Sequence, residues 1–241
     1  MPTVKVFKTP DLMASCDMSG SVAVIIDVLR ATSSLVHAFS SGCRLAIPAM
    51  NRQCALLAKK QHPNALLCGE ENGVKIPGFD LGNSPQEYTP AMVRDKEIIM
   101  TTSNGTKAIL GAHSQGAGPV LICSFLNLGA VVRRCSQELS TRSGNTFIVC
   151  SGSHGAFSLE DFICAGALAH ELETLGFELH PAAKEAMERF EMYQDDILRA
   201  LQDSPHGQYL ASIGFEGDLA FCARMNAVTN VPSLTQEGLI R

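Results

Sequence analysis

The sequence contains few charged residues and lacks several features that mark common classes of protein. Charged residues make up 18% of the 241 residues and hydrophobic residues 46%, which argues against disorder and predicts a well-filled core. A run of 18 apolar residues is absent, and the first residues lack the layout of a signal peptide. The formal net charge of -5 disfavours a broad basic surface for nucleic acid or acidic lipid. We therefore expect a soluble, cytoplasmic protein that binds neither nucleic acid nor membranes, and the sequence leaves open whether it is a homo-oligomer.

The nine cysteines lack the spacing of a disulfide framework or a zinc site. No two of them form a C-x-x-C pair. Cys68, Cys123 and Cys150 each end an apolar segment, where a free cysteine behaves as a small buried hydrophobe. The pattern predicts structural roles for these cysteines.

Several signatures of phosphate chemistry are also absent. No cysteine is followed six residues later by arginine, and the aspartyl-phosphate pattern D-x-D-x-T does not occur. Neither a P-loop nor a G-x-G-x-x-G segment after a strand is present. A phosphatase with this sequence must use a different arrangement of residues.

Five apolar segments each end in a polar or glycine-bearing turn that leads towards a helix. Alternating strands and helices predict an α/β fold with mostly parallel sheets, and ligands bind at the carboxyl ends of such strands. The five segments are residues 23–26, 65–68, 98–100, 120–123 and 147–150. Further strands are predicted near 4–7, 44–47 and 228–231, and helices at 106–112, 128–139, 159–175, 181–203, 206–213 and 218–225.

A linker at residues 113–119 predicts two lobes. Residues 1–115 would form an N-terminal α/β lobe, and residues 116–241 a C-terminal α/β lobe with a helical C-terminal segment. A long irregular stretch from Gly69 to about Tyr88 is expected to be functional, because such long loops in compact domains usually are.

Asp27 and Arg30 follow the strand at residues 23–26. A carboxylate at a strand end needs a partner, so Asp27 either pairs with Arg30 or has a catalytic or metal-binding role. In the second case Arg30 would bind phosphate oxygens. Thr32 and Ser33 are candidate substrate ligands at the start of the next helix, where Thr32, Ser33 or Ser34 is expected to act as N-cap.

Two further segments supply candidate ligands from the irregular stretch. Glu70 follows the strand at residues 65–68 and is expected to face the site, whereas Glu71 is expected to be solvated. Residues 78–85 contain two glycines, which favours a tight backbone path that brings Asn83 and Ser84 to a ligand. A rigid turn is the alternative.

The densest group of hydrogen-bond donors follows the strand at residues 98–100. Thr102, Ser103, Asn104 and Thr106 lie beside a glycine at a helix start, an arrangement that suits phosphate. Ordinary capping is the alternative, but it needs only one hydroxyl.

The last group lies around a glycine-rich turn. Ser151 and Ser153 belong to this turn and are candidate ligands of the substrate, and His154 is expected to be either a bystander or a weak contact of the ligand. Glu160 and Asp161 lie in the first turn of the next helix, where they either stabilise the helix dipole or share a divalent cation.

Taken in order, these motifs resemble the 2-phosphosulfolactate phosphatase family. The resemblance rests on residues 27–32, 78–85, 101–106 and 158–161, and it continues through Gly214, Asp218 and Cys222 to residues 231–232. It implies an α/β fold with the active site in the cleft between two lobes. It also implies a Mg²⁺-dependent phosphatase that converts 2-phosphosulfolactate to 3-sulfolactate and phosphate, a step towards coenzyme M. Glu71 and Asn226 depart from the family pattern.

The predicted site combines these groups. The catalytic residues would be Asp27, Arg30, Glu70, Glu160 and Asp161, and all of these except Arg30 would be metal ligands. A phosphatase for another small phosphorylated hydroxy acid and a non-catalytic phosphometabolite-binding protein are the rival hypotheses. The acidic residues favour an enzyme, because a pure anion binder gains nothing from four carboxylates around a negative ligand.

Overall fold

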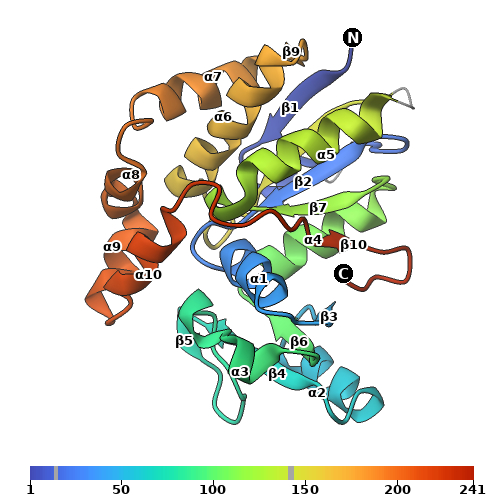
Figure 1. Cartoon of the computed structure of the whole chain (residues 1–241), viewed down its shortest axis with the longest axis vertical. Helices are drawn as coiled ribbons and strands as arrows, with labels where there is room; N and C mark the ends of the chain where they lie inside the picture. The colour runs from blue at the N-terminus through green and yellow to red at the C-terminus, as the bar shows by residue number, and fades with distance from the viewer. Residues whose placement is uncertain (14–15, 141–143) are drawn as a thin grey trace.

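The protein is an α/β structure with two sheets, shown by a computed structural model that describes residues 1–13, 16–140 and 144–241 (Figure 1). The first sheet has the strand order β10-β7-β2-β8-β1-β9. Its strands are β1 (Thr3–Phe7), β2 (Val22–Ile26), β7 (Val120–Cys123), β8 (Thr146–Cys150), β9 (Glu178–Leu179) and β10 (Ser233–Leu234). All neighbours pair in parallel except β10, which is antiparallel to β7.

The second sheet has the order β3-β6-β4-β5 and is formed by the middle of the chain. It contains β3 (Leu45–Pro48), β4 (Leu66–Glu71), β5 (Val74–Lys75) and β6 (Glu97–Thr101). The first three strands in the order are parallel, and β5 folds back antiparallel on β4. The predicted α/β fold with mostly parallel sheets is therefore confirmed.

Thirteen described helical segments connect and cover the strands. The chain order begins with η1 (Pro10–Met13), α1 (Ala31–Ser40), α2 (Arg52–Gln61), η2 (Pro85–Glu87), α3 (Pro90–Val93), α4 (Gly105–Ser114) and η3 (Phe125–Asn127). It continues with α5 (Leu128–Ser140), α6 (Leu159–Thr174), α7 (Pro181–Glu191), α8 (Ile197–Asp203), α9 (Pro205–Ser212) and α10 (Glu216–Cys222). In Figure 1, α2 and α3 lie with the second sheet, and α8, α9 and α10 form a group on the opposite side of the molecule from the C-terminus.

The core explains why the central strands are apolar throughout. Every residue of β2, β7 and β8 is buried, as expected of parallel strands that are covered on both faces. One face of the first sheet packs with α5, α6 and α7, and the other face packs with α1 and α4. Cys123, Cys135, Cys150 and Cys164 lie in the first of these clusters, so the structural role predicted for the buried cysteines is consistent with their positions.

Three local predictions are wrong. The single helix expected at residues 181–203 is divided into α7 and α8, because the side chain of Asp196 accepts a hydrogen bond from Arg199 N and starts a new helix. The last strand is β10 at residues 233–234 rather than 228–231. Helix α1 begins at Ala31 after Arg30, so none of the hydroxyl residues at positions 32–34 is its N-cap.

The two sheets do not follow the predicted lobes. Strands β1 and β2 precede residue 115, yet they pair with β8 and β7 from the later part of the chain. Backbone hydrogen bonds of the first sheet therefore join strands from both sides of the predicted boundary between residues 115 and 116. The division of the chain into two lobes stays a prediction.

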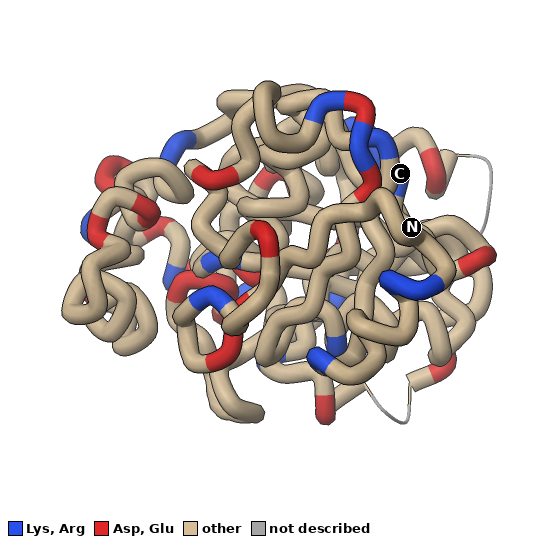
Figure 2. Tube along the Cα trace, turned by 90° about the horizontal axis from the view of Figure 1, so that it is seen from below, with Lys and Arg blue, Asp and Glu red and all other residues tan. Residues whose placement is uncertain are grey.

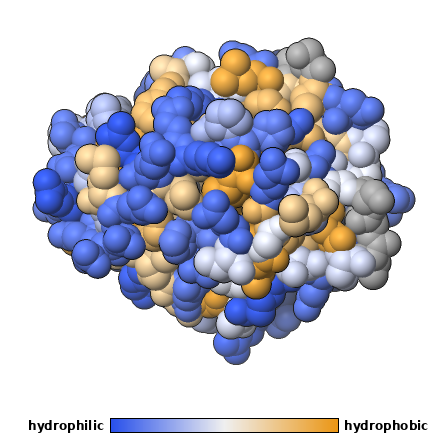
Figure 3. Space-filling model, turned by 90° about the horizontal axis from the view of Figure 1, so that it is seen from above, coloured by the Kyte–Doolittle hydropathy of each residue, from blue (hydrophilic) through white to orange (hydrophobic). Residues whose placement is uncertain are grey.

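The surface matches the low and mixed charge of the sequence. Acidic and basic residues are interspersed along the chain trace in Figure 2. The face in Figure 3 is mostly hydrophilic, with separate hydrophobic patches. None of the helices in the described part of the chain has the length and apolar character needed to cross a membrane.

Candidate active site

A pocket of about 250 Å³ lies where strands from both sheets end. Asp27 follows β2, Glu70 lies near the end of β4, Ser103 follows β6 and Ser153 follows β8, and all four residues line this pocket. We call it the central pocket. Four of the five predicted strand ends therefore meet at one place. The fifth turn, after β7, closes on itself instead, because Ser124 and Asn127 form a reciprocal cap.

An adjoining pocket of about 530 Å³, the side pocket, shares part of the same wall. Glu70, Asn72, Ser103, Asn104 and His154 line both pockets. The side pocket adds Arg52, Thr101, Thr102, Lys107 and Ser151, among others. A ligand in the central pocket can thus extend towards additional hydroxyl groups and cations.

Asp27 is a buried carboxylate of the central pocket, with 6% of its surface exposed. Its Oδ1 accepts a hydrogen bond of 3.1 Å from Ala31 N at the start of α1. Its Oδ2 faces the start of α4, where a β carbon on Gly105 would lie 2.7 Å away, so glycine is required for this close approach. Burial raises the pKa of Asp27 to about 7, and the charges of Glu70 and Glu160 act in the same direction. Asp27 can therefore exchange a proton near neutral pH.

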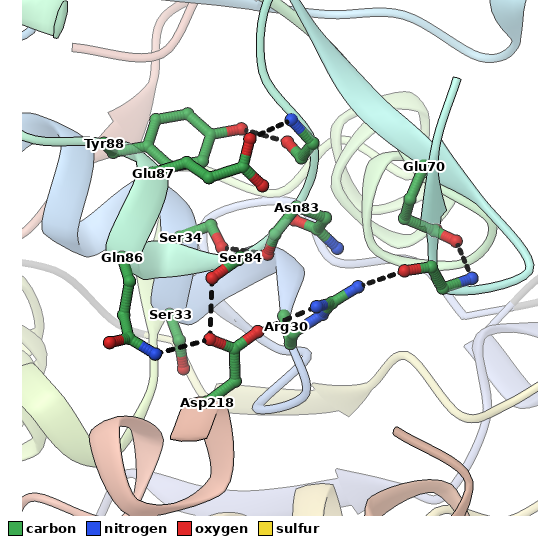
Figure 4. Close-up of polar contacts among 12 residues, drawn as sticks. Arg30, Ser33, Ser34, Glu70, Asn83, Ser84, Gln86, Glu87, Tyr88 and Asp218 are labelled. Carbon is green, nitrogen blue, oxygen red and sulfur yellow. Dashed lines mark hydrogen bonds and ion pairs between the residues drawn. The ribbon is translucent and has the colours of Figure 1, made fainter. Parts of the chain in front are cut away.

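Arg30 lies in the loop after β2, and two hydrogen bonds fix its guanidinium group. Its Nη1 donates to Asp218 Oδ2 at 2.7 Å, and its Nη2 donates to Gly73 O at 2.5 Å (Figure 4). The guanidinium carbon lies 4.2 Å from the centre of the Phe215 ring. Arg30 lines the central pocket, and its described ion-pair partner is Asp218 rather than Asp27. The predicted alternative of an Asp27–Arg30 pair is therefore wrong.

Glu70 connects the turn between β4 and β5 to the segment after β6. Its Oε2 accepts from Gly73 N at 2.7 Å, and its Oε1 accepts from Ser103 N at 2.8 Å. Ser103 Oγ also donates to Glu70 Oε2 at 3.3 Å. As expected, Glu70 is buried while Glu71 is exposed. Glu70 thus positions two loops of the central pocket while it faces the cavity.

Two of the four polar residues after β6 form a local cap. Thr106 N donates to Thr102 Oγ1 at 3.2 Å, and Thr106 Oγ1 donates to Thr102 O at 3.2 Å. Thr106 does not line either pocket, whereas Thr102 contributes to the side pocket. Ser103 and Asn104 line both pockets, and Asn104 Oδ1 also accepts a hydrogen bond of 3.2 Å from His154 N.

Glu160 and Asp161 lie behind the pockets rather than in their walls. Asp161 accepts from Val28 N at 2.8 Å and from Gly152 N at 3.1 Å, so it joins the turns after β2 and β8. Burial raises the pKa values of both carboxyl groups, and the charge of Asp27 further raises that of Asp161. Glu160 Oε2 has no hydrogen-bond partner among the described residues.

The remaining predicted residues divide between the pocket walls and the scaffold. Asn83 and Ser153 line the central pocket, and Ser151 lines the side pocket. The side-chain oxygens of Asn83 and Ser151 are buried without a partner in the described part of the chain, which leaves them for a ligand. Thr32, Ser33 and Ser84 line neither pocket, and their hydroxyl groups donate to Asp27 O, Val28 O and Asp218 Oδ1. Their binding roles stay predictions.

Two residues of the central pocket come from the C-terminal helices and were not predicted from the sequence. His206 and Tyr209 of α9 line the central pocket, and Tyr209 Oη donates to Asn72 O at 2.9 Å. Burial lowers the pKa of His206, as does the neighbouring charge of Arg30. His154, expected to be a bystander or a weak contact of the ligand, lines both pockets. No local motif marks His206 or Tyr209, because their approach depends on the placement of α9.

The carboxylates provide a limited fit for a metal ion. In residues 1–13, 16–140 and 144–241, no group of three or more His, Cys, Asp or Glu side chains is arranged to hold a metal. Mg²⁺, however, is commonly held by one or two carboxylates together with water and substrate phosphate. Asp27 and Glu70 line the same pocket and meet that smaller requirement. The second oxygen of Asp27 accepts no hydrogen bond from the described residues.

Comparisons with known proteins give one consistent result. A family model described as 2-phosphosulpholactate phosphatase matches residues 7–237. A protein of Pseudothermotoga lettingae is 39% identical over 91% of this chain and 92% of its own length. Proteins of Thermotoga maritima and Clostridium acetobutylicum are 40% and 36% identical, over 92% and 93% of this chain and 93% and 97% of their own lengths. All three carry the name "Probable 2-phosphosulfolactate phosphatase".

Proposed function

Because this chain belongs to the 2-phosphosulfolactate phosphatase family, whose members are phosphoric monoester hydrolases, we propose that it hydrolyses 2-phosphosulfolactate to 3-sulfolactate and phosphate. The observation that best supports this proposal is the position of Asp27. It is a buried carboxyl group with a pKa of about 7, placed in a pocket beside an arginine and the start of α4. In an organism that makes coenzyme M, the 3-sulfolactate produced would serve that pathway.

The pocket walls offer donors for a substrate with several negative charges. Ser103 and Asn104 lie at the start of α4, where the helix dipole favours phosphate. Arg30 and Asn83 face the same cavity from other elements. We propose that these four residues orient the phosphate, carboxylate and sulfonate groups of the substrate.

We further propose that activity requires Mg²⁺. Asp27 and Glu70 would hold the ion from the pocket wall, and Glu160 and Asp161 would act from behind by adding negative charge around Asp27. When bound, such an ion neutralises phosphate charge and lowers the pKa of a coordinated water.

The proposed reaction is a direct attack of water on phosphorus. The water oxygen forms a bond to phosphorus, and the bond between phosphorus and the sulfolactate oxygen breaks. One water proton ends on that oxygen, which becomes the hydroxyl group of 3-sulfolactate. Asp27 would be ionised while it holds Mg²⁺, because the charge of the ion lowers the pKa of a ligand, so the pKa of about 7 applies to the metal-free pocket and Asp27 would orient the attacking water.

A route through a phosphorylated Asp27 is the mechanistic alternative. A single turnover in water enriched in ¹⁸O, followed by analysis of the protein, separates the two. Direct attack places the label only in phosphate, whereas hydrolysis of an acyl phosphate by attack at its carbonyl would place it in Asp27. A phosphorylated protein trapped by acid quenching would favour the second route.

The activity itself is tested by phosphate release from 2-phosphosulfolactate and from a panel of phosphorylated hydroxy acids, with Mg²⁺ or with a chelator. We expect turnover with Mg²⁺, loss of turnover in chelator, and an unchanged circular dichroism spectrum in both. Full turnover in chelator after dialysis would exclude the metal requirement. Binding without turnover of any phosphate ester would instead support the non-catalytic alternative.

A further inference from the structure

The most completely buried ion pair described in the protein joins the central pocket to the C-terminal helices. The side chains of Arg30 and Asp218 are each 2% exposed, and their charged atoms are 2.7 Å apart. The two residues are 188 positions apart in the chain. A buried pair of this kind is costly to desolvate and is weak evidence for stability by itself. A role of Asp218 in positioning Arg30 explains why the protein contains this buried pair.

Asp218 is connected to Arg30 on one side and to the η2 segment on the other. Its Oδ2 accepts from Arg30 Nη1, and its Oδ1 accepts from Ser84 Oγ at 2.6 Å and from Gln86 Nε2 at 3.0 Å. Figure 4 shows the carboxylate between these three donors. Asp218 lines neither pocket, so it does not contact a ligand there. Asp218 can therefore act on a ligand through its charge or through the residues that it binds, and of its three donors Arg30 lines the central pocket.

The rest of the Arg30 environment leaves only part of the guanidinium group available. One of its five N–H groups donates to Asp218 and a second to Gly73 O, and Phe215 covers one face. The remaining three N–H groups have no acceptor among the described residues, and Arg30 lines the central pocket.

Gly73 is itself held against α9. It has a φ of 75°, and a β carbon there would lie 3.1 Å from Ile213 and 3.3 Å from Tyr209. The guanidinium group is therefore held by Asp218 of α10 and by Gly73 O of the turn between β4 and β5.

We propose that Asp218 is a positioning residue, which holds the Arg30 guanidinium group so that its free N–H groups bind an anionic group of the substrate in the central pocket. Ser84 and Gln86 complete the arrangement, because they fix the carboxylate that fixes the arginine. This inference rests on the proposed function for its substrate. It gives helix α10 an indirect role in substrate binding, since no residue of α10 lines either pocket.

Charge and position predict opposite effects for Asp218→Asn. If Asp218 only lowered the positive charge near the pocket, its removal would strengthen anion binding. If Asp218 positions Arg30, binding weakens, because the amide has one acceptor oxygen for three donors and its NH₂ group cannot accept from the guanidinium group. Arg30 would bind the substrate in both the ground state and the transition state. We therefore expect KM to rise at least about tenfold with a much smaller change in kcat.

The test compares Asp218→Asn with Arg30→Met and with the double variant, in kinetics with 2-phosphosulfolactate and in calorimetric binding of 3-sulfolactate. If Asp218 acts through Arg30, the double variant is no weaker than Arg30→Met alone. Asp203→Asn is the matched control, because it also removes an aspartate that pairs with an arginine in the C-terminal helices, but Asp203 is exposed and lines neither pocket. We expect Asp203→Asn to behave as the unaltered protein.

Tighter binding by Asp218→Asn, kinetics equal to those of Asp203→Asn, or an additive loss in the double variant would each overturn the inference. Should Asp218→Asn fail to fold, Ser84→Ala keeps both charges and removes the 2.6 Å hydrogen bond. It is expected to raise KM in the same direction by a smaller factor, and an unchanged KM would contradict the inference. If the proposed function is wrong, the unaltered protein does not hydrolyse 2-phosphosulfolactate. The binding of 3-sulfolactate or phosphate to the variants then still shows whether Asp218 positions Arg30.

Discussion

The polar segment after β6 allows capping and ligand binding to be separated by two substitutions, Thr106→Val and Ser103→Ala. Thr106 exchanges hydrogen bonds with the backbone of Thr102, because its Oγ1 accepts from Thr102 N at 3.3 Å and donates to Thr102 O at 3.2 Å. Ser103 lines both pockets, and the one hydrogen bond of its Oγ within the described part of the chain is 3.3 Å long, to Glu70. We expect Thr106→Val to affect stability and Ser103→Ala to affect phosphate affinity.

The magnitudes follow from burial. Thr106 is 1% exposed, so Val fills its space but deprives the buried N–H and C=O groups of Thr102 of this partner. Loss of a partner for a buried polar group costs about 1–3 kcal/mol, and each kcal/mol lowers the Tm of a domain of this size by about 2–4 °C. For Ser103→Ala the cost in stability should stay below about 1 kcal/mol. A lost hydrogen bond to a charged phosphate is worth about 1.5–3 kcal/mol, or about 10- to 100-fold in affinity.

The assay measures thermal unfolding and inhibition by inorganic phosphate on the same preparations of both variants. Ser103→Ala should lose phosphate inhibition at nearly unchanged Tm, and Thr106→Val should show a lower Tm with unchanged inhibition. Retention of phosphate inhibition by Ser103→Ala would refute the reasoning and return the whole segment to a structural role. Weakened inhibition in Thr106→Val at an unchanged Tm would show that the cap assignment is wrong.

Three further predictions concern other groups. Asp27→Asn and Glu160→Gln should each lower kcat at least about 100-fold while the circular dichroism spectrum is retained, and near-normal turnover would remove either residue from the proposed machinery. Burial lowers the pKa of His206 below its ordinary 6.5, so the unfolded chain binds the proton more readily and His206 reduces stability as the pH falls below about 6.5. His206→Asn should therefore lose less Tm between pH 7.5 and pH 5 than the unaltered protein, and parallel pH curves would contradict this. Cys54 is exposed and Cys16 partly so, whereas the other seven cysteines are buried, so iodoacetamide should modify only these two without loss of activity; stoichiometric inactivation at a buried cysteine would disprove a purely structural role.

Local patterns were sufficient for most strands and helices, because each depends on neighbours within a few residues. Asn51 caps α2 by accepting from Cys54 N, and Ser158 caps α6 by accepting from Asp161 N, as is usual for these residue types at a helix start. The apolar segment that became β2 is buried along its whole length. The same local reasoning failed at residues 181–203, where Asp196 restarts the helix and its capping tendency outweighs the continuous amphipathic pattern.

The order of the motifs along the chain also predicted where the candidate site lies. It did not predict which side chains face the cavity and which ones bind the surrounding backbone. Parallel strands leave their carboxyl ends at one edge, so Asp27, Glu70 and Ser103 could be expected to meet. Spacing alone does not show that Asp161 accepts hydrogen bonds from two backbone N–H groups. It also does not show that Thr106 forms hydrogen bonds with Thr102 while Ser103 lines the cavity. These differences depend on where each side chain points, and neighbouring residues in a turn can point in opposite directions.

The sequence by itself determined the α/β class, the strand ends that form the pocket and, through its ordered motifs, the family. Only the tertiary structure decided which charges pair. Arg30 lies three residues from Asp27 but binds Asp218, which α10 brings to it from the far end of the chain. His206 and Tyr209 reach the central pocket in the same way, on α9. The physical reason is that hydrophobic periodicity reports which face of an element is buried, whereas contact between distant elements is set by how those buried faces pack together.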